Sequence, residues 1–88
     1  MLFLATYSYP PEKREQVIRR RLDKGAMDSP KAKLLGEWSY AGGGKVFRLI
    51  ETDDVTALFA STRAWADLGH IEIFPVLETE SALKLLAS

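Results

Sequence analysis

Few residues in the sequence have side chains that suggest catalysis. His70 is the single histidine among 88 residues, and cysteine is absent. Because histidine titrates near neutral pH, His70 and the nearby carboxylate Glu72 are the candidate catalytic residues for proton transfer. A lone histidine at the start of a predicted strand is nevertheless more commonly a surface group than a base. One histidine without any thiolate also falls short of a transition-metal site, so we expect neither a metal nor a cofactor.

A pair of opposite charges is predicted near the middle of the chain. Residues 41–44 (Ala-Gly-Gly-Gly) form a predicted hairpin loop between two strands, which places Glu37 opposite Arg48 and Trp38 opposite Phe47. Opposite charges that face each other across a hairpin stabilise its register. We interpret Glu37 and Arg48 as a structural ion pair at a sheet face that meets a partner, with Glu72 as a further member of this polar group.

Three large aromatic side chains form the candidate ligand-binding set. Tyr7, Trp38 and Trp65 each combine an apolar ring with one polar group. This combination suits a pocket for a flat organic molecule. The alternative is that the three rings are simply part of the hydrophobic core, which is the commoner role of such residues.

The charge pattern argues against a nucleic-acid or membrane partner. Residues 1–33 contain eight basic and four acidic residues, residues 34–88 contain four and eight, and the net charge is zero. The basic residues between Lys13 and Lys24 alternate with acidic ones, which is typical of a solvated helix face rather than a phosphate-binding surface. The apolar runs are too short to span a bilayer, and the first residues lack the basic start of a signal peptide. We therefore expect a cytoplasmic protein.

The order of predicted elements indicates an α+β fold. Strands are predicted over residues 2–9, 33–40, 45–51 and 71–76, where β-branched and aromatic residues gather between turn signals. Helices are predicted over residues 12–24, 55–66 and 79–87 from the spacing of apolar positions. The order βαββαβ, followed by a short C-terminal helix, is that of a ferredoxin-like sandwich. We expect a single domain over residues 1–88, with an antiparallel four-stranded sheet and both main helices on one face.

The predicted strands are apolar on both faces, although two helices can cover only one. An uncovered apolar face of this size is typical of an interface, and the simplest cover is the same face of a second copy. We therefore predict a homodimer. Tyr7, Trp38, Phe47 and Trp65 are assigned to the helix-covered side, where Tyr7, Trp38 and Trp65 are the residues expected to line a pocket. The interface is predicted to contain Leu2, Leu4, Glu37, Val46, Arg48, Ile50, Phe74 and Val76.

The order of several short motifs resembles a bacterial family of domains of unknown function. These motifs are the opening strand, Gly36-Glu37-Trp38, residues 51–54 at a helix start, and residues 65–68 followed by residues 72–76. The family belongs to the dimeric α+β barrel superfamily, and the resemblance covers nearly the whole chain. It implies the ferredoxin-like fold and a dimer. Relatives include cofactor-free monooxygenases, muconolactone isomerases, haem-binding chlorite dismutases and ligand-sensing domains, so the fold does not by itself assign a function.

Two functions follow as hypotheses. The first is a dimer that binds a small aromatic or apolar metabolite between the sheet and the helices, which is where the monooxygenase relatives have their cavity. The second is a cofactor-free monooxygenase or isomerase acting on such a substrate, in which Tyr7 and Trp38 position the substrate while His70 or a carboxylate moves a proton. The sequence favours binding because it lacks a recognisable set of acid–base groups.

Overall fold

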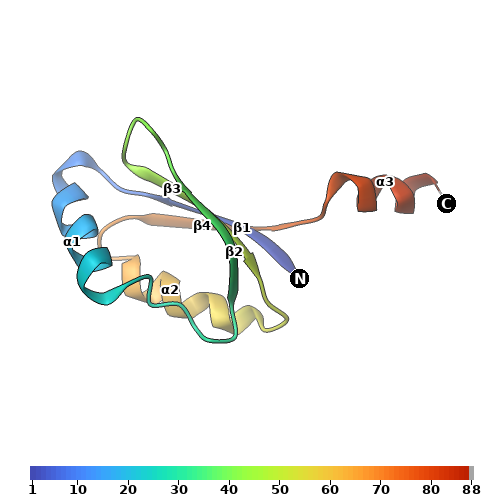
Figure 1. The fold of residues 1–88 in the computed structure, drawn as a ribbon, viewed down its shortest axis with the longest axis horizontal. Helices are drawn as coiled ribbons and strands as arrows, with labels where there is room; N and C mark the ends of the chain where they lie inside the picture. Colours follow the sequence, from blue (N-terminus) through green and yellow to red (C-terminus); the bar gives the residue numbers. More distant parts are fainter. Residues whose placement is uncertain (88) are drawn as a thin grey trace.

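The computed structural model describes residues 1–87 and has the predicted order of elements (Figure 1). The strands are β1 (Leu2–Ser8), β2 (Lys33–Ser39), β3 (Lys45–Glu51) and β4 (His70–Val76). The helices are α1 (Arg14–Lys24), α2 (Leu58–Trp65) and α3 (Thr79–Ala87). Short 3-10 turns, η1 (Pro11–Lys13) and η2 (Val55–Ala57), lead into α1 and α2. The ferredoxin-like prediction is therefore confirmed.

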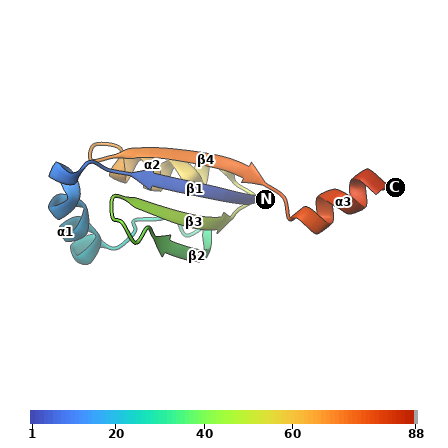
Figure 2. The ribbon, with the colours of Figure 1, turned by 90° about the horizontal axis from the view of Figure 1, so that it is seen from above.

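The four strands form one antiparallel sheet in the order β2-β3-β1-β4. Both α1 and α2 lie on the same side of this sheet, with α1 towards one end of the strands (Figures 1 and 2). We call this side the covered face and the opposite side the open face. Helix α3 continues past the end of β4 and stands away from the rest of the chain.

Pairing between the strands determines which side chains share a face. Phe3 pairs with Ile50, Ala5 with Arg48 and Tyr7 with Val46. The three β1 residues of these pairs alternate with less buried neighbours along the strand, and they form the centre of the core on the covered face. Leu58 packs against Phe3 and Ile50, while Val17, Trp65 and Leu68 pack around Tyr7.

The open face carries the alternate residues of each strand. It includes Leu2, Leu4, Phe74 and Val76, as predicted for the partner-facing side. It also includes Trp38 of β2 and its partner Phe47 of β3, together with Leu49, which pairs with Gly36. None of these side chains is buried within the single chain.

Part of the predicted face assignment is wrong. Glu37, Val46, Arg48 and Ile50 lie on the covered face, whereas Trp38 and Phe47 lie on the open face. The alternation within each strand was correct, but the alternating sets of β2 and β3 were assigned to the wrong faces. No tight turn connects β1 and β3, so the residues between them do not determine how the two strands are aligned. The sequence therefore does not show which alternating set of β3 side chains shares a face with Phe3, Ala5 and Tyr7.

Candidate functional site

A cavity of about 90 Å³ lies between the covered face of the sheet and the elements packed on it. Its volume is several times what a single water needs. Most of its wall is apolar, and a group of charged side chains closes one side. The lining comprises Ala5, Thr6, Tyr7, Val17, Arg21, Ala26, Glu37, Val46, Arg48, Ile50, Ser61, Trp65, Ile71 and Ile73.

Tyr7 and Trp65 form the aromatic part of the wall. Their ring centres are 5.9 Å apart with the planes inclined at 66°, the edge-to-face arrangement that aromatic rings favour. The Tyr7 hydroxyl donates to the Trp65 carbonyl oxygen at 2.9 Å, and Trp65 Nε1 donates to the Ala26 carbonyl oxygen at 2.9 Å. Both polar groups are therefore satisfied by the backbone, and both residues line the cavity.

Two neighbours hold this aromatic pair in place. The guanidinium of Arg20 lies 5.6 Å from the centre of the Trp65 ring system and makes a bidentate ion pair with Asp67, with contacts of 2.7 and 2.8 Å. Gly69 lets the turn after α2 approach β1 closely, because a Cβ there would lie 2.5 Å from the Ser8 carbonyl oxygen and 2.7 Å from the Tyr7 ring. Any side chain at position 69 would displace Tyr7.

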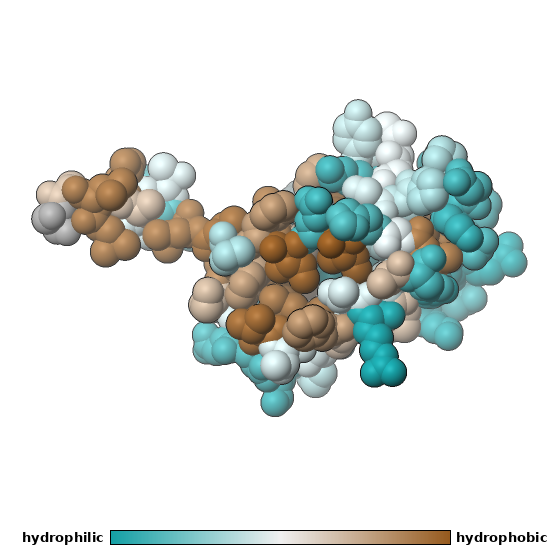
Figure 3. All heavy atoms as spheres, turned by 180° about the vertical axis from the view of Figure 1, so that it is seen from behind, coloured by the Kyte–Doolittle hydropathy of each residue, from teal (hydrophilic) through white to brown (hydrophobic). Residues whose placement is uncertain are grey.

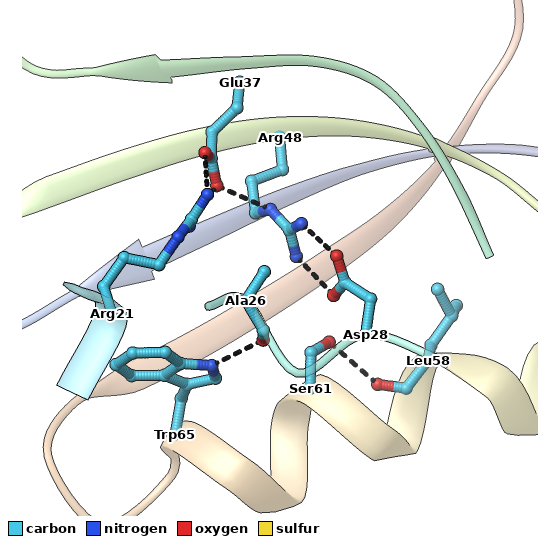
Figure 4. Close-up of polar contacts among 8 residues, drawn as sticks. All are labelled: Arg21, Ala26, Asp28, Glu37, Arg48, Leu58, Ser61 and Trp65. Atoms are coloured by element: carbon cyan, nitrogen blue, oxygen red, sulfur yellow. Dashed lines mark hydrogen bonds and ion pairs between the residues drawn. The ribbon is translucent and has the colours of Figure 1, made fainter. Parts of the chain in front are cut away.

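The charged side of the cavity is a chain of four alternating groups (Figure 4). Arg21 donates to both oxygens of Glu37, at 2.7 and 2.9 Å. Arg48 donates to both oxygens of Asp28, and its Nε lies 2.9 Å from Glu37 Oε2. This last contact is short enough for an ion pair but is not aligned for a hydrogen bond. The buried Nε of Arg48 is therefore paired with Glu37 by charge alone.

The register predicted between Glu37 and Arg48 is confirmed, but their surroundings differ from the prediction. The pair lies on the covered face and is extended by Arg21 from α1 and Asp28 from the loop between α1 and β2. Nothing in the local sequence around Arg21 or Asp28 marks them as partners of the sheet. Only the folding of α1 and of residues 25–32 over β2 and β3 brings them there.

Charge neighbours and burial shift the pKa values of Glu37 and Tyr7 at the cavity. The hydrogen bonds from Arg21, together with the nearby Arg48, lower the pKa of Glu37 and hold it ionised. Burial, assisted by the negative charge of Asp67, raises the pKa of Tyr7 to about 12. Tyr7 is therefore a neutral hydrogen-bond donor at physiological pH and not a base.

Ser61 is a cavity residue that the sequence did not single out. It projects from α2 towards Asp28 and Arg48 (Figure 4). Its hydroxyl donates to the Leu58 carbonyl oxygen at 3.4 Å, beyond the usual length of such a bond. The Ser61 hydroxyl is thus a polar group in the cavity whose present bond is weak enough to be exchanged for one to a ligand.

Trp38 is not part of the cavity. It lies on the open face with 57% of its surface exposed, and its indole ring covers the backbone of Gly36, where a Cβ would collide with it. The space above Gly36 is therefore occupied by the Trp38 ring itself. The prediction that Trp38 lines a pocket under the helices is wrong.

His70 and Glu72 are exposed on β4, on the open face. His70 Nε2 lies 3.2 Å from Glu72 Oε1, and their side chains are 74% and 54% exposed. They pair with Ser8 and Thr6 of β1 rather than joining Glu37 and Arg48, so the expected polar group of three does not form. A catalytic role for either residue stays a prediction, and it would have to be exercised away from the cavity.

Residues 1–87 contain neither a candidate metal site nor a helix that could span a membrane. No group of three or more His, Asp or Glu side chains in this part of the chain comes together as a metal site would require. None of its helices combines the length and apolar character needed to cross a membrane.

The whole chain, residues 1–88, matches the model of the family described as domain of unknown function DUF3303. The chain belongs to this family. The predicted resemblance to a family of domains of unknown function is thereby confirmed. A search of curated proteins found no match.

Two solved structures resemble the DUF3303 chain in fold. One is an antibiotic biosynthesis monooxygenase-like protein from Deinococcus radiodurans, with 12% identity, a TM-score of 0.51, and coverage of 89% of this chain and 93% of the other. The other is an uncharacterized NIPSNAP domain protein from Burkholderia xenovorans, with 18% identity, a TM-score of 0.52, and coverage of 90% and 97%. At these identities the likeness supports the ferredoxin-like α+β fold alone.

Proposed function

We propose that this DUF3303 protein is a homodimer that binds a small apolar or aromatic molecule in the cavity on the covered face. The observation that carries the proposal is the cavity itself, which has apolar walls, two aromatic rings and a small number of polar groups. Such a composition is typical of small-molecule sites, in which apolar contacts supply affinity and a few polar groups fix orientation.

The open face supports the dimer. Its residues Leu4, Phe47, Leu49 and Phe74 form an apolar surface that no element among residues 1–87 covers. Phe74 is 45% exposed, and Trp38 beside this surface is 57% exposed. A second copy that applies the same face would bury all of these side chains at once.

Binding is favoured over the second hypothesis, a cofactor-free monooxygenase or isomerase. The two candidate proton-transfer residues, His70 and Glu72, lie on the opposite face of the sheet from the cavity. Tyr7 stays protonated and Glu37 stays ionised between two arginines. These groups orient a bound molecule more readily than they exchange protons with it.

Tryptophan fluorescence tests the proposal. In Trp38→Phe, the tryptophan emission comes from Trp65 alone, and small aromatic probes such as phenol and toluene should shift or quench it. The response should vanish in Ser61→Leu, whose longer side chain fills the cavity, and persist in Phe59→Leu, which changes a residue 67% exposed on α2.

Thermal unfolding with the same probes provides a second measurement. A molecule that binds only the folded state raises the unfolding temperature by mass action. If none of the probes changes the Trp65 emission or the unfolding temperature, or if Ser61→Leu responds as strongly as Phe59→Leu, the binding proposal is wrong.

A further inference from the structure

Helix α3 has more apolar surface than its own chain can cover. Leu83 and Leu86 lie on one side of it and are 57% and 82% exposed. In residues 1–87, α3 makes no extensive packing contact with any other helix or strand, and it projects from the end of β4 (Figure 1). A nine-residue helix is only marginally stable in water without a packing partner.

A groove lies where α3 leaves the sheet. It has a volume of about 600 Å³ and is lined mainly by apolar residues from the ends of the strands, including Leu2, Leu35 and Leu49, together with Leu77 and the start of α3. Figure 3 shows hydrophobic side chains that run from α3 onto the adjoining end of the body. The groove, the open face and α3 thus form one continuous apolar surface.

Exchange of α3 between two copies would enlarge the contact beyond the open face. A helix of nine residues is about 14 Å long, and each chain would contribute one such helix and receive another. A stable interface buries about 800 Å² of accessible surface on each partner, and the apolar side of α3 adds to what the open face contributes.

We propose that α3 is an arm that packs on a second copy of this chain, with Leu83 and Leu86 seated in that copy's groove beside Leu2, Leu35 and Leu49. A twofold axis repeats the contact, so both arms and both grooves are covered together. This inference rests on the homodimer proposed above and adds to it a specific role for the C-terminal helix.

Sedimentation of the wild type, a double variant of α3 and a control variant tests the arm directly. The double variant Leu83→Ala/Leu86→Ala should weaken the dimer at least roughly 10-fold, since two leucine side chains leave an apolar interface. The matched control Leu22→Ala removes a leucine that is 80% exposed on α1 and should leave the dimer unchanged.

Hydrogen exchange of the α3 amides gives a second readout that requires no variant. The amides of residues 79–87 should be protected at concentrations where the protein is dimeric and should lose protection on dilution to monomer. Leu4→Asp, a change on the open face, should abolish the protection at every concentration.

The outcomes separate the arm from the dimer. A dimer that is unaffected by Leu83→Ala/Leu86→Ala, with α3 amides that exchange freely, would overturn the arm and leave the sheet-face dimer standing. A wild-type protein that is monomeric at all concentrations would overturn both. A weakened dimer together with concentration-dependent protection of α3 would establish the arm.

Discussion

The two faces of the sheet are built from equally apolar strands, yet the chain treats them differently. The covered face buries Phe3, Ala5 and Ile50 under α2 and the loop of residues 25–32, and it also buries the charged Arg48. The open face has leucines and aromatic rings that are only half-buried or exposed. The face with the buried charge is therefore the one that the chain covers by itself, whereas the apolar side chains of the open face stay uncovered within residues 1–87.

The difference follows from what each type of side chain requires. A buried guanidinium must be paired, because an unpaired buried charge is strongly destabilising. Arg48 obtains them from Asp28 and Glu37, which lie on separate elements. Leucine and phenylalanine have no such requirement and can be covered by any apolar surface, including that of a second copy.

The largest expected effect comes from placing a charge on the open face. Leu4→Asp would bury an unpaired carboxylate at the centre of the proposed interface, so the dimer should dissociate, with its dissociation constant raised roughly 100-fold or more. Analytical ultracentrifugation measures this change. Leu22→Asp, on the exposed side of α1, is the control. A Leu4→Asp protein that dimerises like the wild type would remove the distinction between the faces.

Removal of the buried charge of Arg48 should destabilise the covered face strongly. Arg48→Met leaves Asp28 and Glu37 without their shared partner and should lower the free energy of unfolding by about 3 kcal/mol. Lys45→Met, near the hairpin, removes a cation that lies over the Phe47 ring and should cost less than about 1 kcal/mol. Urea denaturation compares the two variants, and equal losses would contradict the account.

Charge reversal across the hairpin tests whether Arg21 and Asp28 interact with the Glu37–Arg48 pair. If Glu37 and Arg48 formed an isolated pair, Glu37→Arg/Arg48→Glu would recover stability lost in the single variants. The structure predicts little recovery, because the new arginine would face Arg21 and the new glutamate would face Asp28. A double-mutant cycle by urea denaturation measures the coupling. Substantial recovery would show that Arg21 and Asp28 are not true members of the network.

Acidification should affect the covered face modestly. The pKa of Glu37 is lowered on folding, chiefly by Arg21, so its stabilising contribution is present above its usual value of 4.5 and is lost as pH falls through the lower folded value. Glu37→Gln should therefore flatten the decline of stability with acid, whereas Glu15→Gln on α1 should leave it unchanged. Urea denaturation between pH 6 and the acid limit of folding checks this. Equal slopes in the wild type and Glu37→Gln would contradict the assignment.

The sequence predicted the elements well because each depends on local signals. The glycine-rich loop fixed the hairpin register, which correctly placed Glu37 opposite Arg48 and Trp38 opposite Phe47. The capping side chain of Asp54, which accepts from the Thr56 amide, likewise agrees with the acidic residues expected at that helix start. Strong local patterns of this kind need no knowledge of the rest of the fold.

The site was harder to predict because it depends on non-local pairing. Tyr7 and Trp65 were placed correctly on the covered face, whereas Trp38 was assigned to the wrong face, because the register between β1 and β3 could not be predicted. Arg21, Asp28 and Ser61 were missed because their neighbours in the sequence do not distinguish them from ordinary polar surface residues. Their role arises only where α1, the loop and α2 meet the sheet.

We propose that the small molecule binds on the covered face and not on the open face. Methyl resonances in an NMR titration with a small aromatic probe test it directly, because the two faces carry different methyl groups. The account predicts shifts at Ala5, Val17 and Ile73, which line the cavity, and none at Leu4 or Leu49 on the open face. Shifts confined to the open-face leucines, or no shifts at all across a panel of probes, would contradict it.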